Sequence, residues 1–415
     1  MEQDSVVIVA GRRTPFARVG TALAHHSALS LGSHAVTAVM EAGGLPRESI
    51  GALCFGNVVL DPRTPNAGRE IVLRTDLPPS LPAHTLSAYC ISGLRAVTAI
   101  TQEIASGRIQ AGIAAGADSL SQPPLLFRPA ATRTFMELAR ARGLGSRLRA
   151  LLGFRPGHLL PEAPGVAEPS TGLTMGEHCE ITAKSWKIPR AAQDELALRS
   201  HRRAVAAWSD GRLAAEVAPL DGLTRDNLLR PDTSLEKLAG LQPVFDKGPA
   251  GTLTAGNSSP LTDGGSAVLL ASQRLAEEAG APILARVRDW EYAAIDPADG
   301  LLMAPALAVP RLLARHGLTL DDMDLVEVHE AFSAQVLANL SAWEQGWKEQ
   351  AVGRVDNLRL NVSGSSIAVG HPFAATGGRI ITTLANEMHR RQVRRGLVSI
   401  CAAGAMAGAV LLERP

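Results

Sequence analysis

Short, almost wholly apolar runs recur along the chain, and segments with helical spacing of apolar residues separate them. The runs cover residues 6–10, 113–117, 267–271, 325–328 and 397–400. Most of them lack polar alternation and are bounded by turn residues, which is typical of strands buried on both faces. Regular alternation of such strands with helices predicts an α/β fold.

Two of the intervening helical patterns end at a glycine, a common stop signal for a helix. The apolar positions with helical spacing are Leu94, Val97, Ile100 and Ile104 before Gly107, and Val309, Leu312 and Leu313 before Gly317.

Between about residues 123 and 246 the strand signals become rare, while Pro, Gly and Arg become frequent. A long helical pattern follows Pro189, which suits a first helical turn, and Gly211 can end it. This stretch predicts an inserted helical domain. The expected division is an N-terminal half of residues 1–122 and 247–275, an inserted loop domain of residues 123–246, and a C-terminal half of residues 276–415.

The two flanking α/β stretches are similar in size, and each has a cysteine near a Gly/Ala-rich turn. A chain of 415 residues is also longer than most single cores. We therefore expect a duplicated architecture, a hypothesis that unrelated halves would refute.

Composition excludes several classes of protein. The 41 Lys+Arg residues balance 40 Asp+Glu residues, and with only 8 Phe, 5 Trp and 2 Tyr the chain is not expected to bind nucleic acid. The N-terminus does not resemble a signal peptide, and no apolar run approaches the ~20 residues of a membrane span. We expect a reducing, cytoplasmic location, because no CxxC spacing occurs among the four cysteines Cys54, Cys90, Cys179 and Cys401.

Cys90 lies where an extended segment is expected to turn into a helix. The partial positive charge of a helix N-terminus would favour the thiolate form, which is the environment of a nucleophile. The alternative is a buried structural cysteine, and the local sequence leaves both interpretations open.

His371 lies in a Gly/Ser-rich loop, residues 364–377, and is followed directly by Pro372. Histidine is the usual general base for a cysteine nucleophile. The alternative is a histidine that only hydrogen-bonds backbone carbonyls in a tight turn.

Cys401 ends an expected strand and precedes small residues that let backbone N–H groups approach a ligand. Such groups build an oxyanion hole. The alternative is close packing of a terminal strand, with Cys401 filling space.

His329 and Glu330 follow the expected strand 325–328, with Phe332 behind them. The alternative interpretation is a solvated turn. A metal site would need a second histidine at helical spacing, and the following residues supply none, so no metal is expected.

In chain order, the four segments that contain Cys90, His329, His371 and Cys401 resemble the thiolase family. Further family-like segments are residues 9–16, 175–176, 193–201 and 254–264. Residues 14–16, residues 65–73 and His329 resemble one branch, the β-oxidation thiolases of trifunctional-type complexes. The resemblance implies two similar five-stranded α/β halves with an inserted helical loop domain.

The resemblance also implies roles for individual residues. Cys90 would accept the acyl group, His371 would take its proton, and Cys401 would act as acid and base on the CoA thiol or the substrate α-carbon. One oxyanion hole would use His371 with a water held by His329, and the other the backbone N–H groups of Cys90 and Ala403.

Two departures from the family pattern matter. Ile91 follows the nucleophile where many members have glycine, which changes the bulk near the acyl pocket. Ala403 and Ala405 stand in a run that is usually richer in glycine, and alanine is penalised wherever that loop needs a positive φ.

For the substrate, the resemblance implies that coenzyme A enters past Met175, Ser259 and Phe332, with no permanently bound cofactor. The expected activity is that of an acetyl-CoA C-acyltransferase, a 3-ketoacyl-CoA thiolase, acting in fatty-acid β-oxidation. The alternatives are a biosynthetic acetoacetyl-CoA thiolase, a β-ketoacyl synthase, which Cys401 disfavours, a Cys/His hydrolase, and a non-catalytic subunit. A homo-oligomer and a hydratase/dehydrogenase partner subunit are also expected.

The segment 128–155 contains seven arginines and one acid, Glu137, with leucines at helical spacing. One interpretation is a solvated helix over the core. The others are an electrostatic guide for anionic CoA, or a basic amphipathic surface for peripheral contact with a membrane or with a partner subunit.

Overall fold

The strands of the N-terminal half form a set with two parallel and two antiparallel pairings. The computed structural model describes residues 5–162, 165 and 167–415. Along the sheet the set runs β4 (Ala83–Leu86), β3 (Ile50–Gly56), β5 (Ala111–Asp118), β8 (Thr262–Ser272) and β1 (Val6–Arg13). The pairings of β3 with β4 and β5 are parallel, and those of β8 with β5 and β1 are antiparallel.

The C-terminal half repeats this pattern. Its set runs β10 (Leu325–Val328), β11 (Arg395–Ala402), β12 (Met406–Glu413) and β9 (Ala285–Ala294), with one parallel and then two antiparallel pairings. Beyond β10, Leu360 forms a parallel bridge with Val326, in the place that β4 takes in the first set. The expected duplication is confirmed, although the fifth position of this half is a single bridge.

The two sets are joined edge to edge. Val7 and Ile8 of β1 pair with Arg286 and Ala285 of β9, and this short contact makes one sheet of ten strands within the described residues. The tenth strand, β2 (Ala17–Arg18), pairs with β8 alone.

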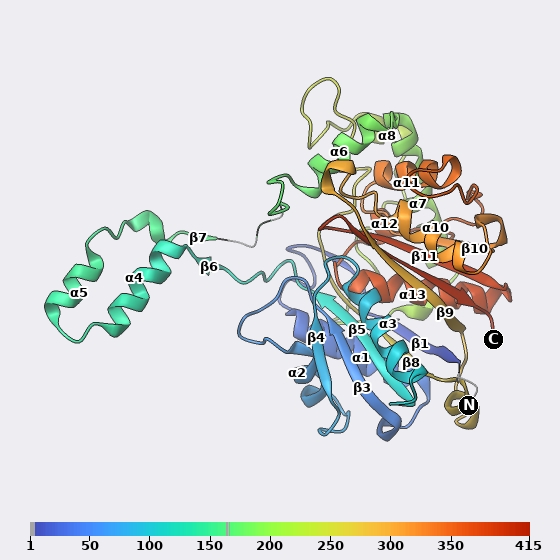
Figure 1. Cartoon of the computed structure of the whole chain (residues 1–415), viewed down its shortest axis with the longest axis horizontal. Helices are drawn as coiled ribbons and strands as arrows, with labels where there is room; N and C mark the ends of the chain where they lie inside the picture. The colour runs from blue at the N-terminus through green and yellow to red at the C-terminus, as the bar shows by residue number, and fades with distance from the viewer. Residues whose placement is uncertain (1–4, 163–164, 166) are drawn as a thin grey trace.

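Helices cover both sets of strands and fill the space between them (Figure 1). Residues of α3 (Ser92–Ala105) and α13 (Ala375–Arg391) share one buried apolar cluster with strands of both halves. The outer face of the first set packs on α1 (Ala28–Gly43) and α2 (Ala67–Arg74). The outer face of the second packs on α10 (Pro305–Arg315) and α11 (Ser333–Gln345).

The central helices α3 and α13 meet at glycines in their first turns. A Cβ atom at Gly93 would lie 2.3 Å from the Ala374 carbonyl oxygen, and one at Gly377 would lie 2.3 Å from the Leu94 nitrogen. No side chain fits at such distances, so glycine is required for this backbone contact. The contact brings together the loops that precede the two helices.

Between β5 and β8 no described residue belongs to the large sheet. Besides a projecting hairpin, the α-helices here are α6 (Met175–Ser185), α7 (Arg190–Ser209) and α8 (Leu235–Ala239). The helix predicted from Pro189 is α7, and Gly211 after it has a φ of 82°. The domain boundaries given above remain predictions.

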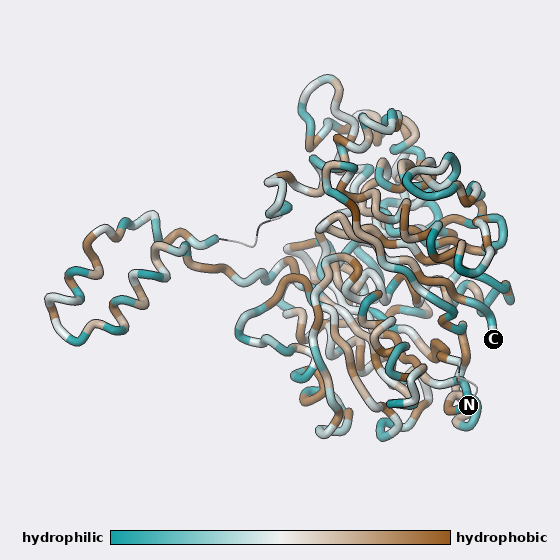
Figure 2. The backbone as a smooth tube through the Cα atoms, in the orientation of Figure 1, coloured by the Kyte–Doolittle hydropathy of each residue, from teal (hydrophilic) through white to brown (hydrophobic). Residues whose placement is uncertain are grey.

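A helical hairpin projects from the body in this stretch (Figure 1). It consists of α4 (Pro129–Arg140) and α5 (Leu144–Leu151), carried on the paired strands β6 (Leu126–Phe127) and β7 (Pro161–Glu162). Leu144 and Leu152 are 77% and 79% exposed, and hydrophobic stretches alternate with hydrophilic ones along it (Figure 2). The interpretation as a helix over the core is therefore wrong.

The remaining helical elements are short. They are α9 (Gln273–Glu278), α12 (Ser366–Val369) and the 3-10 turns Arg47–Ser49, Pro156–Leu159, Ala214–Glu216, Pro297–Asp299 and Leu320–Asp322. None of the helices in the described part of the chain has the length and hydropathy needed to cross a bilayer.

Candidate active site

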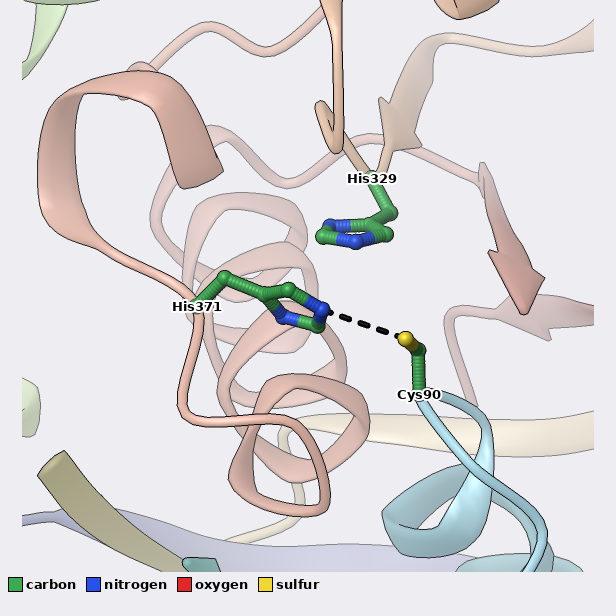
Figure 3. A group of neighbouring side chains, drawn as sticks. All are labelled: Cys90, His329 and His371. Atoms are coloured by element: carbon green, nitrogen blue, oxygen red, sulfur yellow. Dashed lines mark hydrogen bonds between the residues drawn. The ribbon is translucent and has the colours of Figure 1, made fainter. Parts of the chain in front are cut away.

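Cys90 and His371 lie in equivalent loops of the two halves, just before α3 and α13. The Cys90 Sγ atom is 3.2 Å from His371 Nε2 (Figure 3). Tyr89, directly before the cysteine, has a φ of 50°, a strained value for an aromatic residue that turns the chain sharply into α3. The structure thus brings together two predicted site residues that are 281 positions apart in the sequence.

The hydrogen bond at Nδ1 of His371 determines whether Nε2 donates or accepts. His371 Nδ1 is 2.6 Å from Thr376 Oγ1, and the Thr376 hydroxyl is directed at the Pro372 carbonyl at 3.5 Å. The threonine oxygen therefore accepts from Nδ1–H, and the bare Nε2 accepts from the Cys90 thiol. The interpretation of His371 as a histidine bonded only to backbone carbonyls is wrong.

Burial keeps this pair neutral at rest. Desolvation raises the pKa of the Cys90 thiol to about 12, against the opposing effect of the backbone N–H groups of Ala403 and Cys90. Desolvation, with the charge of Arg379 second, lowers the pKa of His371 to about 3. The expectation that the helix N-terminus favours a resting thiolate is wrong, because the cost of burying a charge exceeds that benefit.

His329 stacks obliquely on His371, with ring centroids 4.2 Å apart (Figure 3). Its Nδ1 is 2.8 Å from Ser366 Oγ, while its buried Nε2 has no hydrogen-bond partner among the described residues. Burial first, then His371 and Arg379, hold the pKa of His329 well below its usual value. A neutral imidazole with one free nitrogen therefore faces the Cys90–His371 pair.

Glu330 anchors the backbone that presents His329. Its carboxylate is buried and accepts from the Ser200 hydroxyl at 2.6 Å and from Asn361 Nδ2 at 2.7 Å. Asn361 in turn bonds both the N–H and the carbonyl of Val328. The alternative interpretation of this segment as a solvated turn is wrong.

Cys401 lies in a small buried apolar cluster with Phe332, and Met175 packs against the same cluster. Burial, followed by the neighbouring thiols Cys90 and Cys179, raises the pKa of Cys401 well above its usual value. Ser259 lies beside the cluster, because its N–H donates to the Ala331 carbonyl at 2.9 Å. The residues predicted to line the CoA path therefore adjoin the second cysteine.

The turn after Cys401 has two residues in the left-handed region. Gly404 has a φ of 71° and Ala405 a φ of 53°, whereas Ala403 is not among the positive-φ residues. The predicted penalty on alanine thus applies at Ala405 only. The Gly404 N–H donates to the buried Glu168 carboxylate at 2.9 Å, which ties the inserted stretch to this turn.

Several supporting residues were not found from the sequence. Asp118 accepts from the Ala374 N–H at 2.8 Å and from the Val58 and Val59 N–H groups, and desolvation raises its pKa to about 6. The only available signal was a polar residue at the end of an apolar run. The other supporting residues that the sequence analysis did not identify are Ser366, Thr376, Arg379, Asn361 and Glu168.

In the part of the chain that the structure describes, two groups of side chains have spacing that would suit a metal ion. The ligand atoms of Cys90, His329 and His371 lie within 4.8 Å of one another, and so do those of the exposed group His25, His26 and Asp221. In the first group His371 Nε2 already accepts from the Cys90 thiol. The expectation of no metal stays a prediction.

Comparison with known proteins covers nearly the whole chain. Residues 6–274 match the family model "Thiolase, N-terminal domain", and residues 281–414 match "Thiolase, C-terminal domain". The chain is 44% identical over 423 residues to the 3-ketoacyl-CoA thiolase of Pectobacterium carotovorum subsp. carotovorum (strain PC1), covering 99% of this chain and 97% of the relative. It is 43% identical, with the same coverage, to the 3-ketoacyl-CoA thiolase of Escherichia coli (strain 55989 / EAEC).

Solved structures are similar over the same extent. Human mitochondrial 3-ketoacyl-CoA thiolase superposes with a TM-score of 0.85 at 30% identity, covering 100% of both chains. Its complex with CoA gives the same TM-score and identity, covering 100% of this chain and 98% of that one. The Bacillus anthracis acetyl-CoA acetyltransferase has a TM-score of 0.86 at 28% identity, covering 99% of both chains.

Proposed function

The chain belongs to the thiolase family, and on this premise we propose that it is a 3-ketoacyl-CoA thiolase. It is an acyltransferase that cleaves 3-ketoacyl-CoA with CoA to give acetyl-CoA and a shortened acyl-CoA. The observation that supports this best is the pairing of the Cys90 thiol with a bare Nε2 of His371, beside a second buried cysteine.

In the first half-reaction, Cys90 Sγ attacks the 3-keto carbonyl carbon while its proton passes to His371 Nε2. The C2–C3 bond then breaks, which leaves the shortened acyl group on Cys90 as a thioester. The electron pair of that bond goes to C2 of the departing acetyl-CoA, which takes a proton from the Cys401 thiol. The raised pKa of Cys401 suits this role, since the thiol still holds its proton when the carbanion forms.

In the second half-reaction, the thiol of free CoA loses its proton to the Cys401 thiolate and attacks the Cys90 thioester. The acyl–sulfur bond to Cys90 breaks, and Cys90 regains its proton from His371. Both cysteines return to their starting thiols, so the cycle is closed without any external acid or base. Run backwards, the same steps make a carbon–carbon bond by Claisen condensation.

Each half-reaction places negative charge on a carbonyl oxygen. For the Cys90 adduct, the backbone N–H groups of Cys90 and Ala403 are the proposed donors, since both act to lower the pKa of the Cys90 thiol and so lie near its sulfur. For the acetyl-CoA enolate, the donors are His371 once protonated and a water held by His329. Each such donor contributes about 3 kcal/mol of transition-state stabilisation.

The substrate and partner assignments follow the same premise. Met175, Ser259 and Phe332 are proposed to line the pantetheine path, because they adjoin the cluster that contains Cys401. Coenzyme A is then a substrate and not a resident cofactor. The homo-oligomer, the hydratase/dehydrogenase subunit, the cytoplasmic location and the role in β-oxidation belong to this proposal.

The test is steady-state kinetics with 3-ketoacyl-CoA substrates of graded chain length and free CoA. Parallel lines in double-reciprocal plots and an acyl group trapped on Cys90 are the expected results. A preference for acetoacetyl-CoA alone would favour the biosynthetic alternative. Folded protein without cleavage, condensation or adduct would overturn the proposal in favour of a non-catalytic subunit.

A further inference from the structure

The Ser366 hydroxyl lies between Arg379, whose guanidinium can only donate hydrogen bonds, and Nδ1 of His329, which can donate or accept. Arg379 Nη2 donates to Ser366 Oγ at 2.7 Å, and His329 Nδ1 is 2.8 Å from the same oxygen. All three side chains are fully buried. A guanidinium has no acceptor, so Ser366 Oγ must accept the bond from Arg379.

Only one position of the histidine proton leaves the Ser366 hydroxyl with a partner both as donor and as acceptor. If His329 carried its proton on Nδ1, Ser366 Oγ would accept twice, and its own proton would lack an acceptor, because no other bond of that hydroxyl exists within the described residues. A buried donor left unpaired is costly. The satisfied arrangement runs from Arg379 to Ser366 Oγ, and from the Ser366 hydroxyl to a bare Nδ1.

We infer that Arg379 and Ser366 are positioning residues that fix His329 as the tautomer with its proton on Nε2. His329 then presents a permanent N–H donor to the substrate oxygen or to the water beside it. The Nε2 atom of His329 is buried and has no hydrogen-bond partner within the described residues, so its N–H can donate to a bound ligand. The inference rests on the proposed function, since a donor is needed only where an oxyanion develops.

The arrangement on His371 is the opposite one. Its Nδ1–H donates to Thr376, which leaves Nε2 bare as the base for Cys90. Of the two stacked imidazoles, His371 therefore presents a lone pair and His329 an N–H to one substrate. The tautomer of each ring is fixed by a hydroxyl that bonds its Nδ1. If His329 took the other tautomer, it would turn a lone pair toward the developing negative charge, and it would offer no N–H to the substrate oxygen or to the water beside it.

The first test is a double-mutant cycle in the full-length enzyme. Ser366→Ala is expected to lower kcat about tenfold with little change in KM, less than the roughly 10²-fold cost of deleting an oxyanion donor outright. Ser366→Thr keeps the hydroxyl and should retain most of the activity. In a His329→Gln background, whose amide N–H needs no tautomer to be fixed, Ser366→Ala should cause no further loss.

Ser365→Ala is the matched control. Ser365 is also buried and also lies within 3.4 Å of Arg379, but no hydrogen bond joins it to His329. Its effect on kcat should be the same with His329 and with His329→Gln. Equal losses for Ser366→Ala in the two backgrounds would overturn the inference, since they would indicate a merely structural role.

The second test reads the tautomer directly. In protein labelled with ¹⁵N at histidine, the His329 resonances, assigned by their loss in His329→Gln, should show a bare Nδ1 and a protonated Nε2, and His371 the reverse. A protonated Nδ1 on His329 would overturn the inference while wild-type thiolysis stood. Absence of thiolysis in the wild type would instead refute the proposed function, so the two failures are distinguishable.

Discussion

The two halves of the molecule share one strand order but place different side chains at equivalent positions. The residue directly after β3 is Asn57, and the residue directly after the matching strand β10 is His329. The next matching strands end in Asp118 in the first half and in Cys401 and Ala402 in the second. Asn57 and Asp118 bond each other at 2.8 Å, whereas His329 and Cys401 face the reaction site.

The comparison shows that the two halves of a duplicated fold can have different roles at one site. In the proposed mechanism the first half supplies one reacting atom, Cys90 Sγ, while its Asn57 and Asp118 hold loops. The second half supplies the proposed base, the proposed donor and the second thiol. The connections differ as well, because residues 119–261 join β5 to β8 in the first half while residues 403–405 join β11 to β12 in the second.

The largest effect on activity is expected from replacing Cys90, the residue of the first half that is proposed to react. Cys90→Ala should lower thiolysis by at least about 10⁴-fold, because no thioester can form. The unfolding midpoint in urea should stay close to that of the wild type, since His371 is the one side chain among the described residues that the thiol hydrogen-bonds. Activity within tenfold of the wild type would contradict the role given to the first half and would assign the nucleophile to the second half.

A smaller loss is expected at the second thiol. Cys401→Ser should lower kcat by about 10²- to 10³-fold, because a hydroxyl is a far weaker acid than a thiol for proton transfer to C2. Acylation of Cys90 by a reactive acyl thioester, followed by mass spectrometry, should survive this change. Loss of that adduct would mean that Cys401 acts on Cys90 itself.

The contributions of His371 and Asp118 to the pH dependence of stability should differ in sign. The pKa of His371 is lowered to about 3, so the unfolded chain binds the extra proton and stability rises with pH from about 3 to 6.5. The pKa of Asp118 is raised to about 6, so the folded chain holds the proton, and stability falls with pH between about 4 and 6.

Removing each group should therefore change that dependence in opposite directions. Urea unfolding of His371→Asn across this pH range should lose part of the rising slope, and Asp118→Asn should lose part of the falling one. The asparagine at 118 should also destabilise the fold by about 1–3 kcal/mol, since one backbone N–H loses its acceptor. Slopes that change in the same direction would contradict this account.

The smallest catalytic effect is expected in the hairpin, which has no counterpart in the second half. Neutralising Arg147, Arg149 and Arg155 to glutamine should leave kcat within about twofold, because surface substitutions rarely disturb a distant core. Co-sedimentation with anionic liposomes should weaken, by about 1 kcal/mol per arginine near the lipid surface. Unchanged sedimentation would count against contact with a membrane, and a raised KM for CoA would favour electrostatic guidance of the substrate.

The sequence predicts the strands and the four catalytic segments because each is a local signal: an apolar run, or a reactive residue beside glycines. It does not reveal Ser366, Arg379 or Glu168. The partners His329 of Ser366 and Gly404 of Glu168 lie 37 and 236 positions away, and a lone serine or arginine has no distinctive pattern. The thiolate expectation for Cys90 failed for a related reason. A helix start is visible in the sequence, whereas the desolvation of Cys90 depends on all the layers packed around it.

The hydrogen bond between Cys90 and His371 closes a loop of 281 residues. A growing chain therefore holds Cys90, the proposed nucleophile, long before it holds His371, the proposed base, and β12, which completes the second half, follows later still. Contacts of such sequence separation form late in folding. During synthesis the reactive thiol remains without its base, so the appearance of activity should report that nearly the whole chain has folded.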